Sequence, residues 1–131
     1  MNETPQIAIR RSMLGRARGT GAARAGRGTW WTQRVTALAL IPLSLWFIAS
    51  MISLESAQRA DVAAWLHAPL ALALVLALIV ATFWHMALGL GEVIEDYVHQ
   101  EGMKLMLILT VRGVSVLLAL LCAVAALRLG L

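Results

Sequence analysis

Residues 35–54, VTALALIPLSLWFIASMISL, form an apolar run of 20 positions without a charged side chain. An α-helix of about 20 residues, rising about 1.5 Å per residue, crosses the roughly 30 Å hydrocarbon core of a bilayer. Backbone groups inside lipid must be hydrogen-bonded within their own segment, so this run predicts a transmembrane helix. Pro42 lies inside the run and predicts a kink in that helix.

Two further apolar runs follow the first. Residues 62–91 have only His67 and His85 as titratable groups, and residues 105–127 contain one charged residue, Arg112. Only 14% of the chain is charged, against about 25% in an ordinary soluble domain, so lipid must be part of the solvent. The sequence therefore predicts an all-α integral membrane protein. Its three transmembrane helices are expected at about residues 33–55, 68–96 and 103–129.

The basic residues are concentrated in front of the first run, whereas the first loop contains only Arg59. Seven of the eleven basic residues lie there: Arg10, Arg11, Arg16, Arg18, Arg24, Arg27 and Arg34. By the positive-inside rule, the N-terminus is cytoplasmic and, after three crossings, the C-terminus is periplasmic. We therefore expect a flexible, Gly/Arg-rich cytoplasmic tail at 1–28 and a membrane anchor at 29–131.

The tail also bears on location and on partners. No aromatic residue lies among its arginines before Trp30, which argues against nucleic-acid binding. The tail is rich in glycine, so it would form an amphipathic targeting helix poorly. The expected location is the inner membrane of a bacterium, and the mitochondrial inner membrane is the alternative.

His85 is the main candidate for a functional residue, because titratable side chains within a membrane span are commonly functional. Helical periodicity places Ala81, Gly89, Glu92 and Asp96 on the face of His85. The small residues on either side of His85 leave room for the edge of a porphyrin or for a close helix contact. An imidazole can ligate haem iron, or it can form a hydrogen bond between helices, and spacing alone leaves both interpretations open.

The chain cannot supply both axial ligands of one haem. His99 lies 14 positions from His85, which is about 21 Å along a helix. His67 lies 18 positions away on the other side, or about 27 Å. Two axial nitrogens must meet at a single iron, so a six-coordinate haem at His85 requires a second polypeptide.

The segment His85–His99, HMALGLGEVIEDYVH, resembles the signature of the hydrophobic membrane anchor, or D subunit, of succinate dehydrogenase, which is respiratory complex II. In this family a histidine of the second helix is followed eleven and twelve positions later by Asp-Tyr, here Asp96 and Tyr97. Residues 30–37, WWTQRVTA, are similar to the start of the first helix in alphaproteobacterial members. The resemblance covers about residues 15–131.

The resemblance implies an anchor of succinate:quinone oxidoreductase, an enzyme of the tricarboxylic acid cycle and aerobic electron transport. Its implied partners are a cytochrome b-type C subunit, an iron–sulfur subunit and a flavoprotein subunit, which oxidises succinate. By resemblance, His85 is one axial ligand of the iron of a haem b shared with the C subunit. Tyr97 donates a hydrogen bond to ubiquinone and Asp96 supports that site, while Arg34 meets a haem propionate or lines the quinone site.

Two other functions remain open, the anchor of a fumarate reductase and a non-redox three-helix scaffold. Glu92 departs from the family pattern, in which many relatives have Val at this position. It is expected either to pair with Arg112 or to extend to water or headgroups, as Arg112 would. The carboxylates of the 92–96 segment can likewise be a solvated helix end, and Tyr97 can be an interfacial belt residue.

Overall fold

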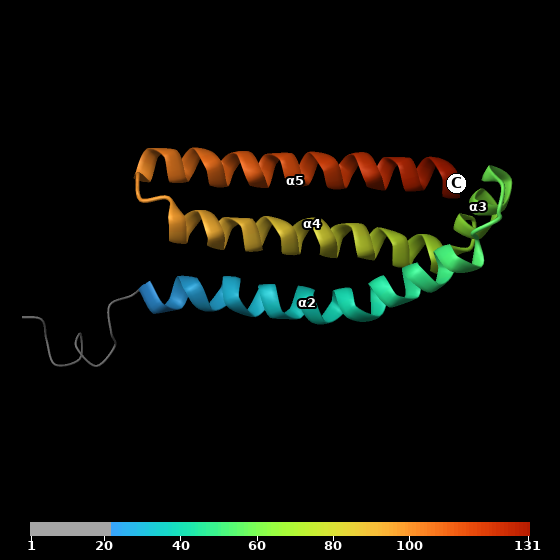
Figure 1. Ribbon diagram of the computed structural model, residues 1–131, viewed down its shortest axis with the longest axis horizontal. Coiled ribbons are helices and arrows are strands. Elements are labelled where there is room, and N and C mark those ends of the chain that lie inside the picture. The colour runs from blue at the N-terminus through green and yellow to red at the C-terminus, as the bar shows by residue number, and fades with distance from the viewer. Residues whose placement is uncertain (1–21) are drawn as a thin grey trace, which may run out of the picture.

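Four helices make up the computed structural model, which describes residues 22–131 (Figure 1). They are α2 (Ala22–Ser53), α3 (Arg59–Leu66), α4 (Pro69–Tyr97) and α5 (Glu101–Gly130). Within the described residues, three helices are long and apolar enough to cross a membrane, namely Gly28–Ser53 of α2, α4 and α5. For residues 22–131 the prediction of an all-helical fold with three helices that fit a membrane is confirmed.

The helix boundaries agree closely with the sequence for α4 and α5, which begin and end within two residues of the expected positions. Pro69 is in the first turn of α4. A backbone N–H at this position has no hydrogen-bond partner within the helix, so proline, which lacks the N–H, costs no helical hydrogen bond. α2 differs, because it begins at Ala22 and not near residue 33. Residues 22–28 are therefore helical although the sequence predicted a flexible tail there; the alanines and arginines among them favour a helix. The rest of that tail, residues 1–21, lies outside the described residues.

α4 lies between α2 and α5 in a single layer (Figure 1). It packs against both neighbours, whereas α2 and α5 do not pack against each other in the described part of the chain. The start of α2, the end of α4 and the start of α5 lie at one end of this layer. α2 contains Pro42, and its second half turns toward α3 in Figure 1, in agreement with the predicted kink.

α3 is the element that the sequence did not predict, since it lies between the expected helices at about 33–55 and 68–96. Its start is closed by Asp61, whose carboxylate accepts a hydrogen bond from the Gln58 N–H at 2.8 Å. Trp65 stacks on Trp46 of α2 with 5.7 Å between ring centroids. Leu66 is buried with Val75 and Ala126, so α3 seals the end of the layer opposite Tyr97.

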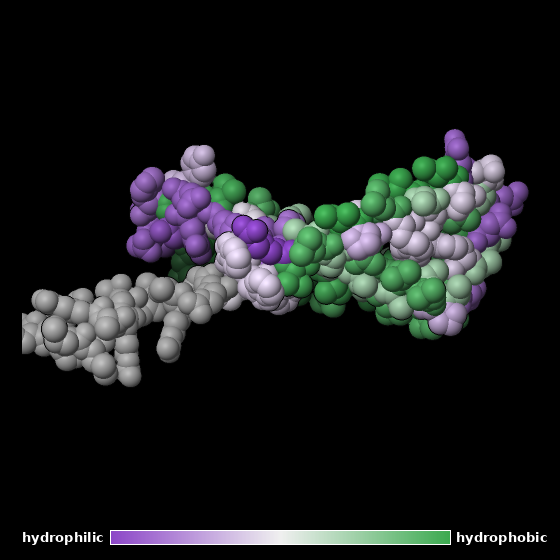
Figure 2. All heavy atoms as spheres, turned by 90° about the horizontal axis from the view of Figure 1, so that it is seen from below, coloured by the Kyte–Doolittle hydropathy of each residue, from purple (hydrophilic) through white to green (hydrophobic). Residues whose placement is uncertain are grey.

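Little of the apolar surface is covered by the chain itself. The buried apolar residues are Leu66, Ala71, Val75 and Ala126. Large apolar side chains are exposed along all three long helices, and Figure 2 shows hydrophobic residues over the middle of the molecule with hydrophilic residues at both ends. In lipid this surface carries no penalty, and it is free to pack against other transmembrane helices.

Candidate functional site

His85 lies half-buried on the side of α4 that faces α2. Its Nδ1 is 3.0 Å from the hydroxyl oxygen of Thr36. The same hydroxyl oxygen is 2.9 Å from the carbonyl oxygen of Thr32 and 3.0 Å from that of Gln33. The candidate histidine is therefore tied to α2 by a hydrogen bond between helices, which is one of the two roles that the sequence left open.

Gly89, one turn after His85, packs against Gln33 of α2. A Cβ atom built on Gly89 would lie 3.2 Å from Gln33 Nε2. The sequence suggested open room beside His85 at this glycine, but in the folded chain Gln33 occupies it. The side-chain oxygen of Gln33 is buried and has no hydrogen-bond partner among the described residues. A polar interior of this kind is uncommon between membrane helices and marks the α2–α4 contact as a candidate site.

Asp96 and Tyr97 lie in the last turn of α4, about 16 Å along the helix from His85. Both side chains are exposed, and that of Tyr97 is 79% exposed. Neither makes a side-chain hydrogen bond within residues 28–131. The carboxylate and the phenol are thus presented outward, available to a ligand or to another subunit.

Glu92 is also exposed, and it does not pair with Arg112. Within residues 28–131 the one ion pair is Lys104–Glu101 at 3.1 Å, at the start of α5. The pairing considered from the sequence fails for a geometric reason. Glu92 is on the same face of α4 as His85, and that face is directed toward α2. Arg112 belongs to α5 and lines the cavity between α4 and α5, on the other side of α4.

Arg34 is not brought to His85 by the fold. Its guanidinium lies over the ring of Trp30, 4.3 Å from the centroid, and its side chain is exposed. This cation–π contact holds the guanidinium on an outer face of α2, away from Thr36 and Gln33. Arg34 could therefore meet only a group that another subunit or the membrane presents to that face.

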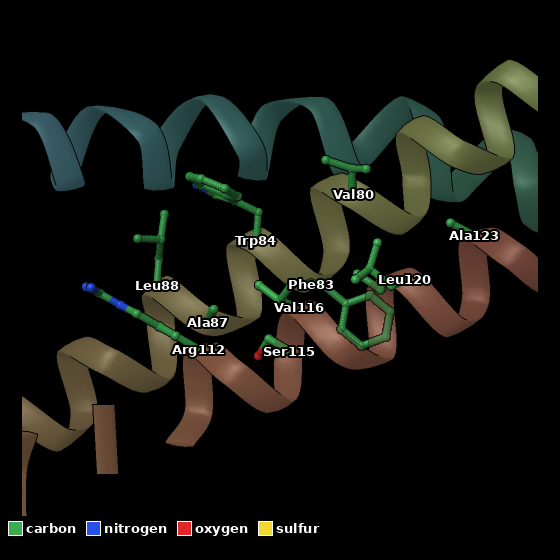
Figure 3. A pocket seen from close by; sticks show the side chains of 11 residues that line it. Val80, Phe83, Trp84, Ala87, Leu88, Arg112, Ser115, Val116, Leu120 and Ala123 are labelled. Carbon is green, nitrogen blue, oxygen red and sulfur yellow. The ribbon is translucent and has the colours of Figure 1, made fainter. Parts of the chain in front are cut away.

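A cavity of about 550 Å³ lies between α4 and α5 (Figure 3). It is lined by Val80, Phe83, Trp84, Ala87, Leu88, Arg112, Ser115, Val116, Ala119, Leu120 and Ala123. None of the predicted site residues lines it. Arg112 is its one charged lining residue, and its guanidinium extends toward the end at which α4 ends and α5 begins. This orientation agrees with a side chain that extends from the apolar span toward water or headgroups.

Thr36 and Gln33 are the site residues that sequence reasoning missed. Both belong to the segment WWTQRVTA, in which the sequence analysis assigned a site role only to Arg34. The signal was present, because Thr32, Gln33 and Thr36 are spaced three and four positions apart and so share one face of α2. A polar stripe at the start of an apolar helix indicates a polar partner on the facing helix, here His85.

The described residues contain no group of three or more His, Cys, Asp and Glu side chains that could hold a metal ion. A haem differs from such an ion because each axial position takes a single protein ligand. His85 meets that requirement for one position. His67 precedes α4 and His99 follows it, so the folded chain offers no second histidine near His85.

Comparison with known proteins gives one family. The family model described as "Succinate dehydrogenase/Fumarate reductase transmembrane subunit" matches residues 8–125. A Rickettsia bellii protein named succinate dehydrogenase hydrophobic membrane anchor subunit is 31% identical over 108 residues, or 82% of this chain and 86% of that protein. A Rickettsia conorii protein of the same name is 30% identical over 98 residues, or 74% and 78% of the two chains. No solved structure gives a significant match.

Proposed function

Because the chain belongs to the family of succinate dehydrogenase and fumarate reductase transmembrane subunits, we propose that it is the hydrophobic membrane anchor of a bacterial succinate:quinone oxidoreductase. The observation that carries the proposal is the match over 82% of the chain to a relative of that name, on a chain with three apolar spans. The anchor holds a flavoprotein subunit and an iron–sulfur subunit at the inner membrane. Succinate oxidation belongs to the flavoprotein.

The charge pattern supports one orientation. By the positive-inside rule, the arginine-rich segment before the first span favours a cytoplasmic start of α2. The end of α4 and the start of α5 lie at the same end of the layer as the start of α2 (Figure 1). Asp96 and Tyr97 are then on the cytoplasmic side, where the peripheral subunits dock, and the C-terminus is periplasmic.

The proposed cofactor is a haem b shared with a cytochrome b-type C subunit. His85 fits one axial position, because it is an imidazole within an apolar span whose Nδ1 is engaged by Thr36 and whose Nε2 makes no hydrogen bond in the described chain. The second ligand must come from the partner anchor, since no other histidine of this chain lies near. A haem held there supplies a one-electron redox centre close to the quinone site.

The proposed quinone site is the last turn of α4. The phenol of Tyr97 donates a hydrogen bond to a ubiquinone carbonyl, whose oxygen gains negative charge on reduction. Asp96, the neighbouring residue, supplies a carboxylate for the protons that quinone reduction consumes. The exposure of both side chains supports this role, because a bound quinone and the iron–sulfur subunit need direct access to them.

One observation favours a second candidate, a non-redox three-helix scaffold. The hydrogen bond between His85 and Thr36 joins α4 to α2, and such a bond by itself is a sufficient structural role for a histidine in a membrane span. The family description also covers fumarate reductase anchors, which use the same chemistry in the opposite direction. Partner subunits and the potential of the quinone distinguish these directions.

Purification of the chain from its native membrane with an affinity tag tests the proposal. We expect three other subunits to co-purify, with b-type haem absorbance and succinate:quinone reductase activity. Recovery of the chain alone, without flavoprotein or haem, would contradict the redox function and favour the scaffold. A complex that reduces fumarate with quinol faster than it oxidises succinate would assign the reverse direction.

A further inference from the structure

The hydroxyl of Thr36 lies within hydrogen-bonding distance of three atoms. Two are carbonyl oxygens of its own helix, those of Thr32 at 2.9 Å and Gln33 at 3.0 Å. The third is Nδ1 of His85 on α4, at 3.0 Å. Within residues 28–131, Thr36 is the one side chain that forms a hydrogen bond with the ring of His85.

The hydroxyl has a single proton to share among these three atoms. Carbonyl oxygens can only accept a hydrogen bond, and two of them already lie on the Thr36 hydroxyl from within α2. With the proton held between the two carbonyl oxygens, the lone pairs of the hydroxyl face His85. Nδ1 must then carry the proton and donate it, and a neutral imidazole protonated at Nδ1 has an unprotonated Nε2.

We infer that Thr36 is a positioning residue that holds His85 in the Nδ1–H tautomer and leaves the Nε2 lone pair free to bind iron. The inference rests on the proposed haem function of His85. The two nitrogens lie on different edges of the ring, so a hydrogen bond at Nδ1 to Thr36 leaves Nε2 without a hydrogen bond to this chain within residues 28–131. A hydrogen-bond acceptor on the distal nitrogen of a metal-binding histidine also raises the basicity of the ligating nitrogen.

A second contact between α2 and α4 lies beside this hydrogen bond. Gln33 lies one turn before Thr36, and Gly89 lies one turn after His85. A Cβ on Gly89 would lie 3.2 Å from the side-chain nitrogen of Gln33, so glycine leaves room for this side chain between the helices. The hydrogen bond and the glycine contact thus join the same two helices at neighbouring turns.

Thr36→Val and Thr36→Ser are a matched pair for the test in the purified complex. Valine keeps the shape of threonine without the hydroxyl, and serine keeps the hydroxyl. We expect Thr36→Val to shift the haem midpoint potential upward and to change the low-spin electron paramagnetic resonance signal, because a less basic ligand stabilises ferric iron less. Thr36→Ser should match the wild type. A potential and signal unchanged in Thr36→Val, or shifted equally in both variants, would overturn the inference.

A measurement on the complex without haem separates this inference from the proposed function. The complex is labelled with ¹⁵N-histidine in a host that cannot make haem, and the ring nitrogens are observed by nuclear magnetic resonance. The signals of His85 are identified as those that are missing in His85→Ala. We expect the Nδ1–H tautomer in the wild type and in Thr36→Ser, and a tautomer mixture in Thr36→Val. An Nε2–H tautomer in the wild type would overturn the inference. Haem that persists in His85→Ala would instead overturn the proposed ligand, whatever the tautomer.

Discussion

The two sides of α4 differ in chemistry. Toward α2, α4 presents His85 and Gly89 to Thr36 and Gln33, and a hydrogen bond crosses the contact. Toward α5, the contact is mostly apolar and borders a cavity of about 550 Å³, in which Arg112 and Ser115 are the polar lining residues. Packing of apolar side chains is enough to hold membrane helices together, so the polar side needs another explanation. Under the proposed function, the α2 side positions the residues of the redox site and the α5 side holds the helices in place.

The largest expected effect is at the exposed end of α4. Tyr97→Phe removes a hydrogen bond to an oxygen that becomes charged, worth about 1.5–3 kcal/mol, or roughly a ten- to hundredfold loss in quinone reductase kcat/KM. Succinate oxidation by an artificial acceptor should be unchanged, because the flavoprotein performs it. Equal loss of quinone reductase activity and of succinate oxidation by the artificial acceptor would contradict this prediction and would assign Tyr97 a structural role.

A smaller effect, on stability alone, is expected from Gly130→Ala on the structural side. The added Cβ would lie 3.0 Å from the backbone oxygen of Leu66 and 3.0 Å from Leu72 Cδ1, so α3 or α4 must shift. Overpacking of this kind costs about 1–3 kcal/mol, which should lower the melting temperature of the complex in detergent. The matched control is Gly113→Ala, whose Cβ meets nothing within 4 Å. A haem spectrum altered by Gly130→Ala but not by Gly113→Ala would contradict this, because packing on the α5 side would then affect the haem site at His85.

The smallest effect is expected from Arg34→Gln. The guanidinium is exposed over Trp30, where a contact with an anionic group of a ligand is worth at most about 1 kcal/mol, or roughly fivefold in affinity. Haem content and the apparent quinone KM of the purified complex measure it. A loss larger than that of Tyr97→Phe would mean that Arg34 leaves Trp30 and becomes buried against the ligand when the subunits assemble.

The three spans could be predicted from the sequence because lipid imposes a length and a composition on any crossing segment. The expected ends of α4 and α5 lie within two residues of the observed ones. The start of α2 was missed because residues 22–28 combine charge with glycine, which resembles a flexible tail although the helix continues through them. α3 was missed because its eight residues depend on Trp65 and Leu66 packing against other helices, which sequence periodicity does not show.

The candidate site was only partly readable from the sequence. The periodicity of α4 placed His85 and Asp96 on one face, but it could not identify the helix opposite that face. Thr36 and Gln33 belong to the site because α2 packs against that face, which the periodicity of α4 does not show. The suggested pair of Glu92 and Arg112 failed for the same reason, since their separation depends on how α5 is rotated against α4.

The claim that His85 of α4 ligates a haem is tested most directly by His85→Gly with and without added imidazole. The measurement is the reduced-minus-oxidised absorbance spectrum of the purified complex, with His99→Gly as the control for a histidine outside the helices. We predict that the low-spin b-type spectrum is lost in His85→Gly, returns when imidazole occupies the vacated position, and is unaffected in His99→Gly. A low-spin spectrum in His85→Gly without imidazole, equal to that of the wild type, would contradict the claim.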